Sequence, residues 1–186
     1  EGEYVTMADA LGGINITISA NSDTIINFFD IEEEKVRDEI TGKERTVLNI
    51  ESKVEDVTQV LLTMARGSTR STAVNEITKQ IISEAVAEEY ADLGITSDPE
   101  SVFASKTGNQ DIFARTKKDM PTIGSWYRRI LQKAEENTNQ DYRFHYSYLV
   151  KVMKQFVREH NGQMAYFDGQ STFELLDGVP FINIDI

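Results

Sequence analysis

The chain has 186 residues, of which 40% are hydrophobic and 27% charged, so it can bury a core and is not a disordered tail. Its 31 acidic residues outnumber its 19 basic ones and give a formal net charge of -12, which repels phosphate backbones and anionic lipid. Direct nucleic-acid binding is therefore disfavoured. Because the chain has no cysteine, disulfides, thiolate nucleophiles and cysteine zinc sites are excluded, and a reducing compartment fits.

No apolar run approaches the roughly 20 residues of a membrane-spanning helix, so we expect no membrane insertion. The N-terminal segment is acidic and lacks the basic residues of a signal peptide. The chain begins at Glu1-Gly2-Glu3-Tyr4 without a methionine and ends in the apolar run Val179–Ile186. Both ends are typical of cuts through structured elements, which favours a piece of a longer protein.

The first part of the chain, residues 1–53, is rich in strand-like segments. Val5–Leu11 predicts a short helix, which Gly12-Gly13 ends because paired glycines adopt positive φ at little cost. Ile14–Ile18 then alternates apolar and polar side chains, the pattern of a half-buried strand. Ile25–Asp30 is a second short apolar run.

Ile31–Ser52 is charge-rich and holds Thr41-Gly42-Lys43 between two stretches with apolar residues. A turn that contains glycine between such stretches is typical of a hairpin. The segment fits a protruding β-hairpin or an ordered loop, and it fits a solvated, mobile loop equally well. The sequence leaves these alternatives open.

From residue 54 the apolar residues recur at the spacing of a helix face, which predicts a helical subdomain over residues 54–162. A first helix covers Val54–Met64, and a second covers Val74–Leu93 with Gly94 as a natural C-cap. Ser97-Asp98-Pro99-Glu100 has the capping side chain and the proline of a helix start.

Pro121-Thr122 begins another predicted helix, which places apolar side chains inward (Trp126, Ile130, Leu131) and basic ones outward (Arg128, Arg129, Lys133). A strongly amphipathic helix follows and runs to about His160. Its inward positions are Tyr142, Tyr146, Leu149, Met153 and Phe156. Met164–Phe167 and Val179–Ile186 are predicted as short strands.

These elements predict an α/β fold dominated by helix, in which a helical subdomain is inserted between strands of an incomplete sheet. The expected parts are a strand-rich core segment at 1–53, the helical subdomain at 54–162 and return strands at 163–186. We expect the strands from the two ends to lie near one another and to self-associate through exposed edges. The expected helical core contains Val74, Ile81, Leu149, Met153 and Phe156.

A complete enzyme needs a site, and the sequence shows none. It has neither a Gly-x-x-x-x-Gly-Lys phosphate loop nor a Gly-x-Ser-x-Gly elbow. Gly67-Ser68-Thr69-Arg70-Ser71 could hold an anion at a helix N-terminus, but an N-capped turn is the simpler interpretation. Zinc takes three or four ligands in close geometry, whereas His145 lies among Arg143 and aromatic residues and His160 at a predicted helix end, so we expect no metal site.

Other polar and aromatic groups have simple structural interpretations. Glu32-Glu33-Glu34 and Glu88-Glu89 are predicted as solvated faces. Aromatic side chains near the end of the helical part could stack on single-stranded nucleic acid, but their helical spacing and the lack of a lysine-rich groove favour packing. These aromatic residues are Phe144, Tyr146, Tyr148, Phe156 and Tyr166.

Several short motifs follow one another along the chain. The first three are Glu1-Gly2-Glu3-Tyr4, Ala10-Leu11-Gly12-Gly13 and Ile26-Asn27-Phe28-Phe29-Asp30, and the later ones are Met120-Pro121-Thr122, Phe167–Thr172 and Pro180–Asp185. Their order and spacing resemble the motor domain of the conjugative-transfer (type IV secretion) ATPases, in the HerA–FtsK group of P-loop motors. Phe28 stands where that family has proline, and residues 31–52 have no counterpart in the pattern.

The resemblance implies an internal fragment of such a motor, which powers DNA or protein transfer in bacterial conjugation, as from a conjugative transposon. In the family, ATP and Mg²⁺ are held by an upstream P-loop and a downstream Walker-B strand. Both lie outside these 186 residues, so the fragment is expected to hold no cofactor and to be inactive alone. The resemblance makes Glu3 the catalytic candidate, close to the nucleotide in the parent protein.

The resemblance also implies a homo-hexameric parent that works with secretion-channel proteins at the cytoplasmic, inner face of the cell membrane. A second interpretation stays open. The chain could be a self-standing acidic interaction module without a catalytic role, which docks a partner through the face near Trp126 or through the aromatic helix.

Overall fold

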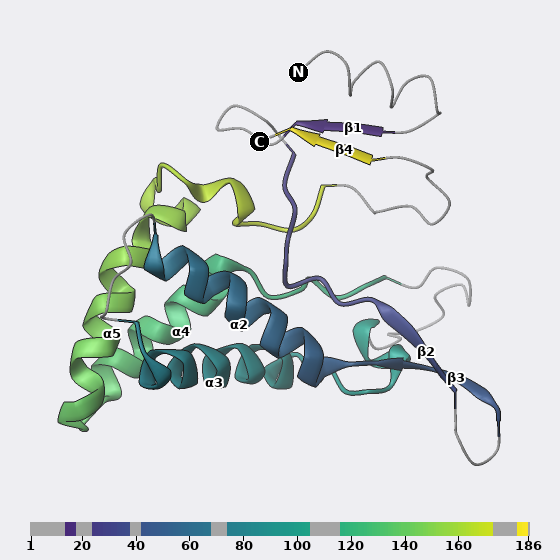
Figure 1. Ribbon diagram of the computed structural model, residues 1–186, viewed down its shortest axis with the longest axis horizontal. Coiled ribbons are helices and arrows are strands. Elements are labelled where there is room, and N and C mark those ends of the chain that lie inside the picture. Colours follow the sequence, from purple (N-terminus) through teal and green to yellow (C-terminus); the bar gives the residue numbers. More distant parts are fainter. Residues whose placement is uncertain are drawn as a thin grey trace. The chain divides into compact units, whose positions relative to one another are not determined.

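The computed structural model describes residues 14–17, 24–37, 42–67, 74–104, 116–172 and 182–185, the first and last of these ranges by their backbone. The elements are β1 (Ile14–Thr17), β2 (Glu33–Arg37), β3 (Glu44–Leu48), α2 (Ile50–Arg66), α3 (Glu76–Asp92), α4 (Ile123–Glu136), α5 (Gln140–Met153) and β4 (Ile182–Asp185) (Figure 1). Short 3₁₀ helices cover Pro99–Val102 (η1), Lys154–Phe156 (η2), Arg158–His160 (η3) and Ala165–Phe167 (η4).

The elements belong to two compact units. The first unit holds the described residues of 1–28, 122–124 and 154–186, and the second holds those of 29–121 and 125–153. The predicted helix-dominated α/β fold is confirmed. Within the described residues, no helix combines the length and the apolar character needed to cross a bilayer.

In the first unit, β1 pairs in parallel with β4, and the register runs from Ile14 opposite Ile182 to Thr17 opposite Asp185. Parallel neighbours cannot be joined by a tight turn and need a crossover connection. Here the connection contains the four long helices of the described residues, α2, α3, α4 and α5. The prediction that strands from the two ends lie together and enclose a helical insertion is confirmed, while the predicted helix at 5–11 lies outside the described residues.

The charge-rich segment of the second unit is a hairpin, which decides between the alternatives that the sequence left open. β2 and β3 are antiparallel, and Arg37 lies opposite Glu44, an opposite-charge pair that stabilises a sheet. Gly42 takes a φ of +66° before β3 begins, a conformation that favours glycine. Leu48 is buried at the base of the hairpin, and its N–H donates to the carbonyl of Ser97 (3.0 Å).

Helix α2 begins earlier than predicted, at Ile50 rather than Val54. The side chain of Asn49 accepts a hydrogen bond from the N–H of Ser52 (3.2 Å), which satisfies one of the free donors of the first turn. Helix α3 ends as predicted, because Gly94 has a φ of +64°. Lys118 Nζ also donates to the carbonyl of Leu93 (2.6 Å), and a cation is favoured at a helix C-terminus.

The core of the second unit lies between α2, α3, α4 and α5, and its largest fully buried side chains are Phe29, Leu61, Ile81, Ile82, Tyr90, Trp126, Tyr127, Ile130, Leu149 and Met153. All five predicted core residues are buried. Leu131, predicted to face inward, is half-buried, and Tyr127 is buried beside Trp126 in its place. Three tyrosine hydroxyls donate to backbone carbonyls: Tyr90 to Phe29 (2.6 Å), Tyr127 to Val150 (2.9 Å) and Tyr148 to Ala65 (2.8 Å).

Two predictions for the C-terminal part are wrong. Helix α5 ends at Met153 rather than near His160, because buried Val157 has an extended backbone that separates η2 from η3. The predicted strand Met164–Phe167 is instead mostly η4. The N–H of Met164 donates to the carbonyl of Gln155 (2.9 Å), so this segment folds back on the preceding turn and does not join a sheet.

Thr58 and Thr78 are both fully buried in helices, but only Thr78 has hydrogen-bond partners among the described residues. We expect Thr58→Val to raise the free energy of unfolding by about 1 kcal/mol, because it removes a buried hydroxyl without a partner. The same substitution at Thr78 should lower it by about 1–3 kcal/mol, because the hydroxyl caps α3 and contacts His145. Chemical denaturation of both variants tests this, and a loss of stability in Thr58→Val would show a hydroxyl partner that the described residues do not contain.

Candidate functional site

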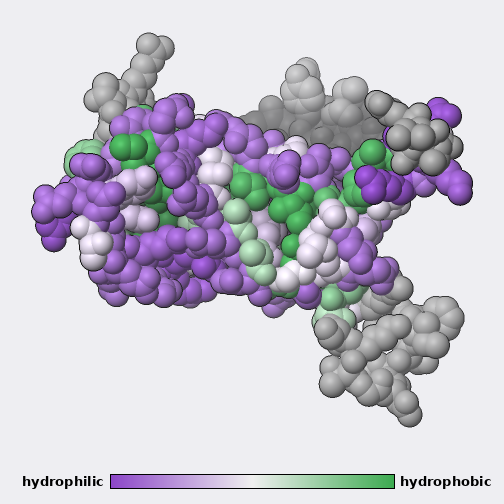
Figure 2. Space-filling model, turned by 90° about the horizontal axis from the view of Figure 1, so that it is seen from below, coloured by the Kyte–Doolittle hydropathy of each residue, from purple (hydrophilic) through white to green (hydrophobic). Residues whose placement is uncertain are grey.

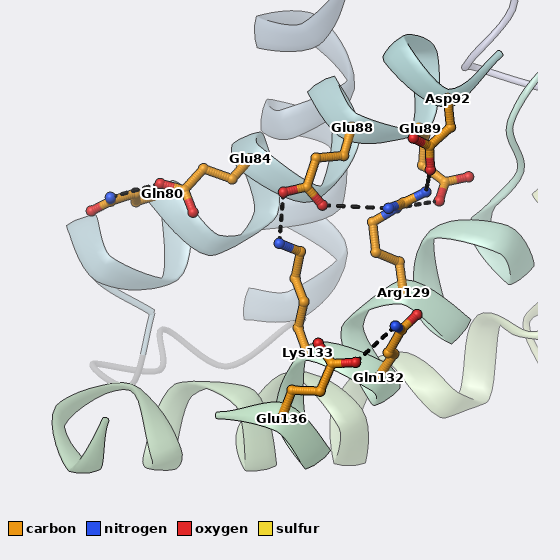
Figure 3. A network of polar contacts seen from close by, with 9 residues as sticks. All are labelled: Gln80, Glu84, Glu88, Glu89, Asp92, Arg129, Gln132, Lys133 and Glu136. Atoms are coloured by element: carbon orange, nitrogen blue, oxygen red, sulfur yellow. Dashed lines mark hydrogen bonds and ion pairs between the residues drawn. The ribbon is translucent and has the colours of Figure 1, made fainter. Parts of the chain in front are cut away.

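A group of charged side chains joins α3 to α4 (Figure 3). Glu88 and Asp92 are four residues apart on α3, and Arg129 and Lys133 are four residues apart on α4. Residues at this spacing share one face of a helix. Each helix therefore presents a short row of one charge, acidic on α3 and basic on α4.

Arg129 lies at the centre of this group, which we call the α3–α4 ion cluster. Its Nε donates to Glu89 Oε1 (2.6 Å), Nη2 to Asp92 Oδ2 (2.6 Å) and Nη1 to Glu88 Oε2 (3.4 Å). Lys133 Nζ donates to the other oxygen of Glu88 (2.7 Å). The planar guanidinium thus uses all three nitrogens, a pattern that lysine cannot reproduce.

The electrostatics of the cluster favour a structural role. Burial alone lowers the pKa of Arg129, but hydrogen bonds to Asp92 and Glu89 outweigh burial and hold this pKa above its ordinary value. Glu89 is only 8% exposed, and a buried carboxylate is tolerated when a cation pairs with it. The arrangement pairs three carboxylates with two cations between the two helices.

This cluster corrects two predictions. Glu89 is buried and ion-paired rather than part of a solvated face, and Arg129 and Lys133 are half-buried and ion-paired rather than fully outward. Both changes have one cause, since a carboxylate enters the interior together with its cation. The sequence signal for the ion pair between Glu89 and Arg129 was the acidic row on one predicted helix and the basic row on another. Glu33 and Glu34 are exposed as predicted.

The histidines have separate surroundings. His145 is buried, with its Nδ1 2.9 Å from Thr78 Oγ1 and its ring edge-on to Phe144 at 5.5 Å. His160 is the last residue of η3 and is exposed. No group of three or more His, Asp or Glu side chains in the described ranges is placed to hold a metal ion.

Two other candidates lie partly or wholly outside the described residues. Gly67 ends α2, and its N–H donates to the carbonyl of Thr63 (3.1 Å), but the rest of the turn that was predicted to be N-capped, Ser68–Ser71, lies outside the described residues. Glu3 is likewise outside the described residues, so its catalytic role stays a prediction.

The aromatic residues are only partly packed as predicted. Phe156 is buried, whereas Tyr146, Tyr148 and Tyr166 are half-buried. Phe144 is 60% exposed and stacks on Tyr148 with 6.3 Å between ring centroids, so the packing prediction is wrong for this residue. Hydrophilic residues predominate on the face drawn in Figure 2, and apolar residues are seen in several smaller areas of it.

Comparisons with known proteins identify the fold. No family model matches the chain, and no curated protein matches it. Two parallel strands that enclose a helical insertion define the class of fold. Within that class of fold, the chain is similar to the solved structure of VirB4 of Thermoanaerobacter pseudethanolicus, with a TM-score of 0.64 and 21% identity. The match covers 100% of this chain and 40% of the VirB4 chain. At this identity the likeness shows the fold, and the chain spans less than half of that VirB4.

Two substitutions test which contacts of the α3–α4 ion cluster stabilise the fold. Arg129→Met should lower the free energy of unfolding by about 3 kcal/mol, because it leaves Glu89 buried without its cation. Asp92→Asn is the matched control: its side chain is 68% exposed, so its loss should cost less than about 1 kcal/mol. Denaturation at low and high salt measures both, and equal losses in the two variants would contradict the special position of Glu89.

Proposed function

We propose that the chain is a piece of the motor ATPase of a type IV secretion system. The observation that carries the proposal is the fold match over the whole chain with VirB4, which is a type IV secretion ATPase. The motifs from Glu1-Gly2-Glu3-Tyr4 to Pro180–Asp185 support it independently, because they resemble the same class of motor in the same order.

In this proposal the nucleotide chemistry belongs to the whole motor. ATP and Mg²⁺ are held by a P-loop and a Walker-B strand that flank the present sequence, and the motor assembles as a hexamer of the HerA–FtsK type at the cytoplasmic face of the membrane. The motor powers the transfer of DNA or protein during conjugation, as in a conjugative transposon, and its partners are secretion-channel proteins. The proposed parts of the chain are 1–53 and 163–186 from the motor core and 54–162 from the helical subdomain.

Glu3 has a specific role in the proposal. It follows a strand of the motor core, where α/β folds bind their ligands, and its carboxylate helps to polarise the attacking water. The described side chains of the chain contribute structure instead. Arg129 and its carboxylates hold α3 against α4 within the helical subdomain.

One observation favours a second candidate, the acidic interaction module. Phe144 and Tyr148 form a stacked aromatic pair, of which Phe144 is largely exposed, and exposed aromatic residues often mark binding surfaces. This candidate needs no nucleotide. ATP binding by the longer protein therefore distinguishes the two candidates, because only the motor proposal expects it.

Calorimetric titration with ATP and Mg²⁺ tests the motor proposal. We expect no binding by the 186-residue chain and binding in the micromolar range by a form that includes the flanking sequence on both sides. Absence of a P-loop before Glu1 in the encoding gene would overturn the proposal, and tight binding by the short chain would reveal a complete site within it.

The role of Glu3 is tested in the longer form. We expect Glu3→Gln to reduce the ATP hydrolysis rate by a factor of about 100 or more, while ATP affinity stays within about twofold, because the carboxylate acts on water and not on nucleotide. Glu1→Gln, which removes a carboxylate from the same segment, is the control. Equal activity of the two variants would remove Glu3 from the mechanism.

A further inference from the structure

Helix α5 carries a surface that differs in charge from the rest of the chain. The chain has a formal net charge of -12, yet it contains no acidic residue between Asp141, in the first turn of α5, and Glu159. The second half of α2 is similar, since no acidic residue occurs between Asp56 and Glu76. Both stretches contain exposed basic residues, so they are local exceptions to the acidic composition.

The hydroxyl of Tyr148 joins these two stretches within the second unit. It donates to the carbonyl of Ala65 (2.8 Å) in the last turn of α2. Arg66, the next residue, is exposed, and so are Arg143 and Lys151 of α5. None of these three cations forms an ion pair with another side chain in the part of the chain that the structure describes. Their charges are therefore not neutralised by the described surface.

The cations of α5 share a helix face with two aromatic residues. Phe144, Tyr148 and Lys151 follow one another at steps of four and three residues, a spacing that places side chains on one face, and Arg143 adjoins Phe144. The buried residues of α5 lie on its other side: His145, Leu149 and Met153. We call the group Arg66, Arg143, Phe144, Tyr148 and Lys151 the α5 surface.

Phe144 is exposed but is held by its neighbours. Its ring meets that of His145 edge-on at 5.5 Å and stacks on that of Tyr148 at 6.3 Å. His145 is in turn held by the Thr78 hydroxyl (2.9 Å) and Tyr148 by the Ala65 carbonyl. A side chain that is already ordered loses little conformational entropy when a partner covers it. Phe144 therefore has the properties of a preorganised apolar anchor.

We infer that the α5 surface binds an acidic segment of a partner protein, one in which an apolar side chain lies between carboxylates. The carboxylates pair with Arg66, Arg143 and Lys151, and the apolar side chain packs on the ring of Phe144. Complementary charge of this kind steers association and selects among partners. The inference needs no nucleotide and does not rest on the motor proposal, so either one can fail alone.

Single-stranded nucleic acid suits the same surface less well. Binding along a phosphate backbone draws on many cations, whereas this surface has three, on a chain with a net charge of -12. Successive bases also need successive open ring faces. Here Tyr148 is half-buried and stacks on one side of Phe144. An acidic peptide needs only one apolar anchor and a few charges.

A nuclear magnetic resonance titration of the 186-residue chain tests the inference. The probe is a short synthetic peptide of glutamate and aspartate with one central phenylalanine. We expect it to shift the backbone amides of residues 143–151 and those near Ala65 and Arg66, with saturation. The shifts should weaken as salt rises, because salt screens exposed charges. A peptide with lysine in place of every acidic residue should leave these amides unchanged.

Two variants remove the two parts of the surface separately. Phe144→Ser removes the apolar anchor, and the double change Arg143→Glu with Lys151→Glu reverses the charge. We expect each to raise the dissociation constant of the acidic peptide by about tenfold or more. The changed side chains are exposed, so the helical circular dichroism should stay the same. The double change decides the matter if Phe144→Ser does not fold.

Each variant has a matched control elsewhere on the chain. Met164→Ser removes another large apolar side chain, which is 44% exposed, and Lys35→Glu with Arg45→Glu reverses two exposed charges of the β2–β3 hairpin. Both controls should keep the dissociation constant within about twofold. Unshifted α5 amides at millimolar peptide, or equal dissociation constants in a variant and its control, would overturn the inference. Oligothymidine or phosphatidylserine vesicles that saturate the same amides at a lower concentration than the peptide would also overturn it.

Discussion

The parallel pairing of β1 with β4 is the constraint on which the rest of the structure depends. It joins backbone segments from the two ends of the chain in one register, and the whole helical part must fit within the connection between them. Closing so long a connection costs conformational entropy, although this cost grows only slowly with length. The helices offset it by forming a core of their own between α2, α3, α4 and α5. A small sheet can therefore carry a much larger helical insertion.

Inside that insertion, one cation sets the arrangement of two helices. Arg129 contacts three carboxylates of α3 with its three nitrogens, and such a fixed fork allows few alternative registers. The apolar core alone would tolerate some sliding of α4 along α3, because hydrophobic contacts are not directional. The ion cluster adds direction at the edge of that core. A helix pair with few permitted registers keeps its arrangement better than one held by apolar contacts alone.

The sequence predicted the features that depend on local patterns. The alternation in Ile14–Ile18 identified β1, and Gly94 identified the end of α3 because its positive φ suits few other residues. The sequence did not reveal features that depend on contacts between residues far apart in the chain. Glu89 was predicted to be solvated because its partner Arg129 lies on another helix. The end of α5 was missed because Phe156 keeps the apolar spacing after the backbone has changed to a 3₁₀ turn. For Glu3, the only catalytic candidate, the evidence is a motif in the sequence, since the described residues do not include it.

The hairpin β2–β3 has a different relation to the rest of the chain. Of its ten strand residues only Leu48 is buried, and most of the others are exposed. Selection for packing therefore acts on its base and hardly on its outer part, where loops and their neighbours tolerate insertions best. The segment also has no counterpart in the motif pattern that the rest of the chain follows. Its outer part can thus change in length and sequence while the fold around it stays the same.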